Sequence, residues 1–328
     1  MTASRRSVVL SAAAAGITLG LDKPLEIFAS AAHAQGKAPA KKPSLTDVGF
    51  AKFKVGDVEV ITVYDGFAAR PIDDKFVPGV SVAQIQAALK KAGLPDGATL
   101  DNPFTVTFIR TKGKTYMFDS STGGQLAPTA GSALAKNIYK AGIQPSKIDG
   151  IIVTHYHGDH ISGMISQTTG SRVFGDTPII VPAAEQAFWT DAAKGGAANK
   201  ALHERVSASL GKWKNVRQVK DGEEVVPGVK AVSTHGHTAG HTSYIVSSGR
   251  NSLLVAGDLT SLYAINLANP GWSISFDGDR AMAEATRRKM FDMAVKERMV
   301  VTGSHWGMPG AGTIRKDGTG YALVPVRV

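Results

Sequence analysis

Apolar and polar residues alternate in short runs after residue 48, a pattern typical of strands with one buried face. A Gly-Asp turn inside residues 55–58 joins two such runs. Residues 104–108 alternate in the same way, and a Lys-Gly-Lys turn leads them into residues 116–118. Both segments therefore predict antiparallel hairpins.

Segments with helical periodicity lie between and after these hairpins. Ser81 can cap a helix that carries Val82, Ile85 and Leu89 on one face and ends at Gly93. Further helices are expected after Ser132, Ala183 and Asp279. This mixture of hairpins and helices predicts sheets covered by helices, and it argues against a helical bundle or a pure β-barrel.

The first 34 residues have a different pattern. Two arginines at positions 5 and 6 precede an uncharged run over residues 8–21, as in a twin-arginine export signal. That run is shorter than the stretch of about 20 apolar residues that a permanent membrane helix needs. We therefore expect residues 1–34 to be removed after export, residues 35–48 to form a flexible linker, and residues 49–328 to form one domain of a periplasmic or secreted protein.

The composition restricts the chemistry that is available. A chain of 328 residues with 43% hydrophobic residues can bury a large core. It has no cysteine, so disulfides and thiolate ligands are excluded, and a metal site would need His, Asp or Glu. The net charge is +10, but Lys37, Lys41 and Lys42 lie in the linker. No long basic block alternates with aromatic residues, so we expect no nucleic-acid partner.

A loop rich in histidine follows the apolar run at residues 150–153. It contains His155, His157, Asp159 and His160. His155 and His157 are alternate residues leaving a strand, so they can face one metal ion. Asp159 and His160 follow a glycine and can turn toward a second ion. The loop thus predicts the start of two adjoining metal sites.

Three other residues of metal-binding type, His237, Asp258 and His305, lie just beyond apolar, strand-like runs. Side chains at strand ends are held by a rigid scaffold and can reach an open cleft. A single histidine such as His305 is more often a structural residue than a ligand. The repeated strand-end setting favours the ligand interpretation for all three.

These motifs resemble those of the metallo-β-lactamase superfamily, which has a His-x-His-x-Asp-His loop, a Gly-His-Thr-x-Gly-His segment, an aspartate after a strand and a late histidine. They stand here at residues 155–160 and 236–241, at Asp258 and at His305. Residues 233–246 and 318–326 are similar to the methyl parathion hydrolase group and its lactonase and esterase relatives. The resemblance covers most of residues 50–328 and implies an α/β (α+β) fold, an αββα sandwich, for a catalytic domain at residues 49–328.

The resemblance also implies a binuclear metal centre. It places His155, His157 and His237 on one divalent ion, Asp159, His160 and His305 on the other, and Asp258 between the two. Zinc is the expected metal, although such ligands also accept manganese, cobalt or iron. Asp119 and His241 are expected to support the ligands from behind, and His203 is expected at the surface.

A metal-bridging hydroxide would then attack a lactone or a carboxylic or aryl ester, with organophosphate triesters as further substrates. Asp159 and Asp258 would take part directly, because they hold the reacting metals. Leu126 and Trp189 are expected in the substrate pocket, with a core position in its helix as the alternative for Trp189. Leu126 stands where organophosphate-cleaving relatives have an aromatic residue, which favours lactones and esters. Tyr263 is a further candidate, because lactonases of the superfamily often have a tyrosine soon after the bridging aspartate.

Two other activities use the same fold. A β-lactamase would share every metal ligand, and a non-hydrolytic iron oxidoreductase could be built on the same scaffold. The expected partner is a small-molecule ester, lactone or phosphotriester, with no permanent membrane anchor. The physiological substrate, the native metal and the oligomeric state, including a homodimer, are left open by the sequence.

Overall fold

The structure, a computed structural model, describes residues 44–125, 132–191, 193–194 and 196–328. Residues 44–328 belong to one unit. The expected export signal, residues 1–34, lies outside the described residues, and so does most of the expected linker. The last linker residues were expected to be flexible, but they form the short helix α3 (Leu45–Val48). No described helix is both long enough and apolar enough to span a membrane.

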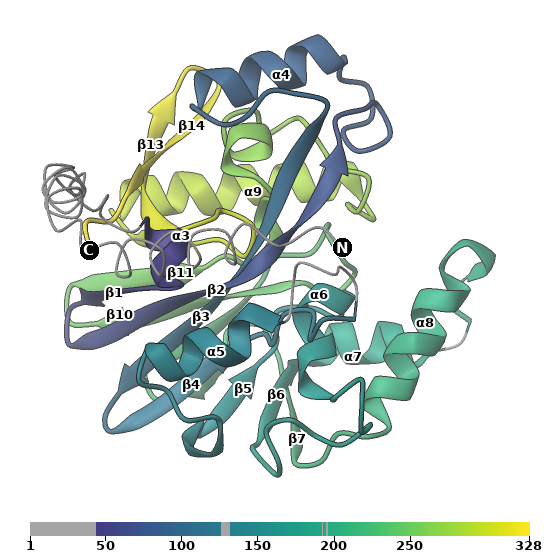
Figure 1. Ribbon diagram of the computed structural model, residues 1–328, viewed down its shortest axis with the longest axis vertical. Coiled ribbons are helices and arrows are strands. Elements are labelled where there is room, and N and C mark those ends of the chain that lie inside the picture. Colours follow the sequence, from purple (N-terminus) through teal and green to yellow (C-terminus); the bar gives the residue numbers. More distant parts are fainter. Residues whose placement is uncertain (1–43, 126–131, 192, 195) are drawn as a thin grey trace, which may run out of the picture. The chain divides into compact units, whose positions relative to one another are not determined.

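The first sheet joins both predicted hairpins to a parallel half (Figure 1). Its described strands, in spatial order, are β1 (Phe50–Val55), β2 (Val58–Pro71), β3 (Thr99–Thr111), β4 (Lys114–Phe118), β5 (Gly150–Ile152), β6 (Ile179–Pro182) and β7 (Val216–Val219). β1 to β4 pair antiparallel, and the pairs β1–β2 and β3–β4 confirm the two hairpins. β4 to β7 pair in parallel. Parallel strands need crossover connections, and the crossover from β5 to β6 contains the histidine-rich loop.

The second sheet is mostly antiparallel. Its described strands, in spatial order, are β14 (Gly320–Pro325), β13 (Ala311–Asp317), β12 (Val300–Thr302), β11 (Asn251–Val255), β10 (Thr242–Ser248), β9 (Val229–Ser233) and β8 (Glu224–Val226). β11 and β12 pair in parallel, and the other neighbours pair antiparallel. The late histidine, His305, therefore follows a strand that lies beside the strand leading to Asp258.

The two sheets pack face to face through apolar side chains. Val60 and Phe118 of the first sheet share a buried cluster with Tyr244 and Leu253 of the second. The Tyr244 hydroxyl donates a hydrogen bond of 2.6 Å to the carbonyl of Val153. This bond ties the second sheet to the chain just before the histidine-rich loop.

Helices cover the outer faces of both sheets. α5 (Ser132–Lys140), α7 (Ala183–Thr190) and α8 (Gly196–Leu210) pack on the first sheet, and α9 (Arg280–Lys296) packs on the second (Figure 1). This order of layers is the predicted αββα sandwich, which is confirmed. The helix predicted after Ser81 is α4 (Val82–Lys91), and the Ser81 hydroxyl accepts a hydrogen bond from the Gln84 amide as a capping residue should.

The shorter helical turns lie in the connections. They are η1 (Pro145–Lys147), α6 (Gly158–Ile161), η2 (Ser162–Met164), η3 (Gly257–Leu259) and η4 (Tyr263–Leu267). α6 and η3 carry Asp159, His160 and Asp258, so these residues of the expected metal centre lie on short turns and not on long helices.

Candidate metal centre

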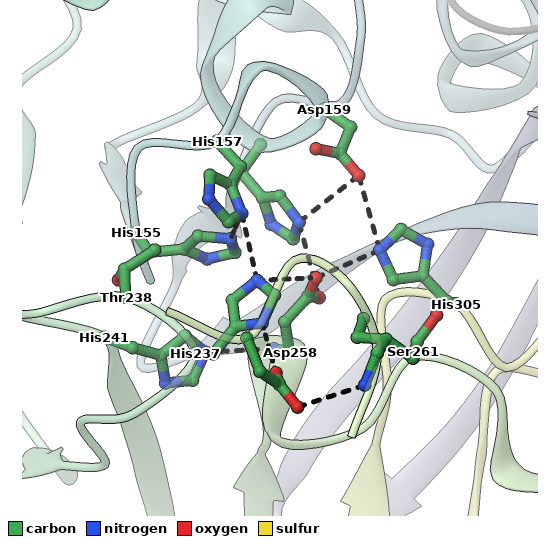
Figure 2. Close-up of polar contacts among 12 residues, drawn as sticks. His155, His157, Asp159, His237, Thr238, His241, Asp258, Ser261 and His305 are labelled. Carbon is green, nitrogen blue, oxygen red and sulfur yellow. Dashed lines mark hydrogen bonds and ion pairs between the residues drawn. The ribbon is translucent and has the colours of Figure 1, made fainter. Parts of the chain in front are cut away.

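The expected metal ligands lie just beyond the ends of four strands, β5, β9, β11 and β12. Figure 2 shows the side chains of the labelled ligands pointing toward one another: His155, His157, Asp159, His237, Asp258 and His305. Among the described residues, the expected ligands form two groups, His155, His157 and His237 in one, and Asp159, His160, Asp258 and His305 in the other. Within each group the ligand atoms lie within 4.8 Å of one another.

The three histidines of the first group share one centre. Nδ1 of His157 lies 3.1 Å from Nε2 of His155 and 2.9 Å from Nε2 of His237. Burial lowers the pKa of His155 well below its ordinary value, and it lowers the pKa of His157 to about 3. Both imidazoles are therefore kept neutral, which is the form that binds a metal ion.

Asp258 lies between the two groups. One of its carboxylate oxygens, Oδ2, is 3.4 Å from Nε2 of His237 and 3.1 Å from Nε2 of His305. Its other oxygen, Oδ1, is 3.3 Å from Nε2 of His160. Asp159 completes the second group, with Oδ2 3.3 Å from Nε2 of His305. Asp258 thus has the position that a carboxylate bridging two cations requires.

The second group stabilises positive charge. Burial acts to lower the pKa values of His160 and His305, but the carboxylates of Asp258 and Asp159 outweigh it. The pKa of His305 rises to about 10, and that of His160 rises well above its ordinary value. Burial likewise acts to raise the pKa values of the two aspartates, yet the neighbouring histidines lower both. The aspartates are therefore ionised and available to a cation.

The donor set fits divalent cations. His160 Nε2 and Asp258 Oδ1 are buried 3.3 Å apart, and neither atom makes a hydrogen bond. An unsatisfied buried polar atom costs about 1–3 kcal/mol, and coordination would remove that cost. Imidazole nitrogens and carboxylate oxygens without thiolates are the ligands of zinc and of similar divalent ions.

Hydrogen bonds behind the ligands hold the imidazole rings in the orientation that coordination needs. The outward ring nitrogen, Nδ1, bonds to a fixed acceptor in four histidines: His155 to Thr154 Oγ1 at 3.0 Å, His160 to Asp119 Oδ2 at 2.8 Å, His237 to Asp277 Oδ1 at 2.9 Å, and His305 to the Pro103 carbonyl at 2.8 Å. A proton on Nδ1 leaves the lone pair of Nε2 facing the centre. Asp119 lies behind His160, where it was expected.

The chain matches a known protein family over most of the described domain. A sequence profile of the metallo-beta-lactamase superfamily matches residues 103–305, which is more than half of the chain. The chain belongs to the metallo-beta-lactamase superfamily. The predicted resemblance is thereby confirmed, and the second group of ligands ends at the last matched residue, His305.

Relatives within this superfamily include N-acyl homoserine lactonases. The chain is 28% identical over 184 residues to one from Bacillus sp, a match that covers 56% of this chain and 66% of that protein, slightly less than two thirds. It is 27% identical over 220 residues to one from Bacillus cereus, covering 66% of this chain and 75% of that protein.

Solved structures have the same architecture. AidC, a dizinc quorum-quenching lactonase in complex with a product, matches with a TM-score of 0.76 and 26% identity, covering 85% of this chain and 98% of that one. The hydrolase AbOPH of the beta-lactamase superfamily matches with a TM-score of 0.78 and 23% identity over the same shares of the two chains, a likeness of fold alone.

In this superfamily member, His241 contacts the backbone of a ligand and not the metal-facing atoms. Its Nε2 accepts a hydrogen bond of 3.0 Å from the amide of Asp258, and its Nδ1 lies 2.8 Å from Thr234 Oγ1. Burial lowers the pKa of His241 to about 3, so the ring stays neutral and can accept that bond. Gly257 has a φ of +56°, and a Cβ there would meet His241 Nε2 at 2.8 Å. A glycine is therefore needed for His241 to reach the amide.

Three supporting residues were missed by the sequence reasoning. Asp277 accepts from His237, the buried Arg287 donates to Asp277 at 3.1 Å, and Glu185 accepts hydrogen bonds from two of the ligand loops. None of them belongs to a local motif. Their full burial is the only signal, and it exists only in the folded chain.

The residues expected in the substrate pocket lie in different settings in the structure. Trp189 is 3% exposed and belongs to the core under α7, with its ring centroid 6.4 Å from that of His157. The alternative for Trp189, a core position, is what the structure has. Tyr263 is half-buried in η4 and lines a cavity of about 720 Å³ that none of the expected metal ligands lines. Leu126 lies outside the described residues.

The expectation for His203 is wrong. It was expected at the surface, but it is only 7% exposed, and its ring centroid lies 5.1 Å from that of Trp189. A histidine inside a largely polar helix looks exposed in the sequence. The packing of α8 against α7 turns this face of the helix inward.

Proposed function

We propose that this protein is a binuclear metal-dependent hydrolase that opens lactones, with N-acyl homoserine lactones as the first candidates and other carboxylic or aryl esters as further substrates. The observation that carries the proposal is the position of Asp258 between two complete ligand groups. The choice of lactones is supported by relatives that are N-acyl homoserine lactonases and by the structural likeness to AidC.

Each residue of the centre has a defined task in this proposal. His155, His157 and His237 would hold one cation, Asp159, His160 and His305 the other, and Asp258 both. Two such cations, most simply zinc, supply a water of lowered pKa and polarise the substrate carbonyl. The Asp159 side chain is 22% exposed, whereas those of Asp258 and His305 are 5% and 3% exposed. Substrate would therefore approach from the side of Asp159, while Asp258 keeps the two ligand groups together.

A substrate panel separates this activity from its competitors. Purified protein should hydrolyse N-hexanoyl homoserine lactone and an aryl acetate faster than a dimethyl aryl phosphorothioate or a chromogenic cephalosporin. Metal analysis of the same sample should give two divalent ions per chain. A higher kcat/KM for the cephalosporin would indicate a β-lactamase, and one redox-active iron per chain would indicate an oxidoreductase. Either result would refute the proposal.

A further inference from the structure

Glu185 is a fully buried carboxylate in the first turn of α7, between two of the ligand loops. Its Oε1 accepts hydrogen bonds from the Tyr156 amide at 2.9 Å and from Trp189 Nε1 at 2.6 Å. Its Oε2 accepts from the Thr238 hydroxyl at 2.8 Å and from the Gly240 amide at 2.8 Å. A carboxylate has about four acceptor sites and no donor, so the four donors match it completely.

Three of these four donors, all except Trp189 of α7, lie in the loops that carry the tri-histidine group, His155, His157 and His237. Tyr156 stands between His155 and His157, and Thr238 follows His237 directly. The loop of Tyr156 also carries Asp159 and His160, but Tyr156 and Thr238 directly adjoin only ligands of the tri-histidine group. We infer that Glu185 is a positioning residue that sets the spacing between these loops and thereby the cation affinity of the tri-histidine group. This inference rests on the metal centre of the proposed function and deepens it.

Close backbone contact supports the same role. A Cβ added at Gly240 would lie 2.0 Å from the amide nitrogen of Glu185 and 2.4 Å from its Cα. Both atoms are backbone, so they cannot move aside as a flexible side chain would. Only glycine lets the loop after His237 rest on the start of α7, and this contact brings the Gly240 amide within reach of the carboxylate.

Glu185→Gln tests the inference with little change of volume. The amide of glutamine has one acceptor oxygen and two N–H donors. If the new NH₂ group faces Thr238 and Gly240, the Thr238 hydroxyl can rotate and accept a hydrogen bond from it. The Gly240 amide can only donate, so at least one buried N–H loses its acceptor. We expect the loop after His237 to shift and the affinity of the tri-histidine group for Co²⁺ to fall by about 10–100-fold, as when other supporting hydrogen bonds near a metal are removed.

The two groups can be titrated one at a time. His305→Ala weakens the second group, and His237→Ala weakens the first. Metal-free protein of each background, with and without Glu185→Gln, would be titrated with Co²⁺ by visible absorption in competition with a chelator. The substitution should weaken binding in the His305→Ala background and leave it unchanged in the His237→Ala background. Glu59→Gln, which removes a carboxylate paired with Arg110 on the first sheet, is the control. It should leave the Co²⁺ affinity unchanged in both backgrounds.

The outcomes are distinct. Equal weakening in both backgrounds, or lower thermal stability with unchanged Co²⁺ affinity, would make Glu185 a general structural residue and overturn the inference. If Glu185→Gln does not fold, Trp189→Phe removes a single donor and should give a smaller loss confined to the same group; no loss there would also overturn it. Because Co²⁺ binding needs no substrate, wild-type protein that binds two ions but opens no lactone would refute only the proposed function.

Discussion

Asp258 and His241 are in direct contact, yet they face the centre differently. The carboxylate of Asp258 points toward the histidines of both ligand groups, while His241 bonds to Asp258 through the backbone amide (Figure 2). Asp258 therefore contributes negative charge to the centre, whereas His241 fixes the position of the backbone at Asp258. At the residue scale, these roles predict unequal effects of substitution.

Asp258→Ala should abolish both metal binding and hydrolysis, because it removes the negative charge that two cations would share. His241→Ala should keep most of the metal and lower activity by about 10–100-fold, because the ligand remains but its backbone loses a fixed partner. Mass spectrometry of dialysed protein gives the metal per chain, and lactone hydrolysis gives the rate. Two tightly bound ions and a near-native rate in Asp258→Ala would show that this residue is not a bridge.

At the scale of elements, α9 acts on the centre through one buried side chain. The guanidinium of Arg287 donates to the carbonyls of Leu259 and Pro270 at 2.5 and 2.7 Å and to Asp277 at 3.1 Å. Leu259 directly follows the bridging Asp258, and Asp277 accepts from His237. One helix therefore connects the loop after β11 with the support of the tri-histidine group.

Arg287→Met should lower the free energy of unfolding by about 3–5 kcal/mol, because Asp277 would stay buried without its cationic partner. Arg288→Met is the matched control on the same helix, since its side chain is 40% exposed and pairs with Glu284 at the surface. Arg288→Met should lower the free energy of unfolding by less than about 1 kcal/mol. Denaturant unfolding of both variants measures these free energies. Similar small decreases in the free energy of unfolding would mean that the buried pair of Arg287 and Asp277 contributes little to stability.

At the scale of the whole molecule, the centre needs both sheets. The first sheet supplies the loop after β5, whereas the second supplies the loops after β9, β11 and β12. The contact of 3.3 Å between His160 and Asp258 therefore crosses from one half of the sandwich to the other. Neither half could bind two metals alone, so loss of packing between the sheets would remove the activity together with the fold.

Export also concerns the whole chain, and it remains a proposal based on residues 1–34. Replacement of Arg5 and Arg6 by lysine should retain the precursor in the cytoplasm if the twin-arginine route is used. The mature protein should begin near Gln35. Fractionation followed by N-terminal sequencing tests both points, and periplasmic protein that still begins at Met1 would contradict the cleavage.

The sequence pattern determined the hairpins, the helix starts and the candidate ligands at strand ends, while the αββα layers and the division of the ligands into two groups followed from the resemblance to the superfamily. Hairpins, helix starts and strand-end ligands are local features, because alternation, capping and the residue after a strand depend on neighbours along the chain. The motif at residues 155–160 is local for the same reason, since two ligands on alternate positions need only one strand end.

Only the tertiary structure decided what supports those ligands. Glu185, Asp277 and Arg287 contact loops that are distant in sequence, and no local pattern marks them. The burial of His203 and Trp189 likewise depends on how α7 and α8 pack together. Whether a polar side chain is buried and which donors it meets are properties of the packed chain, because the cost of burying it is offset only by partners that folding brings together.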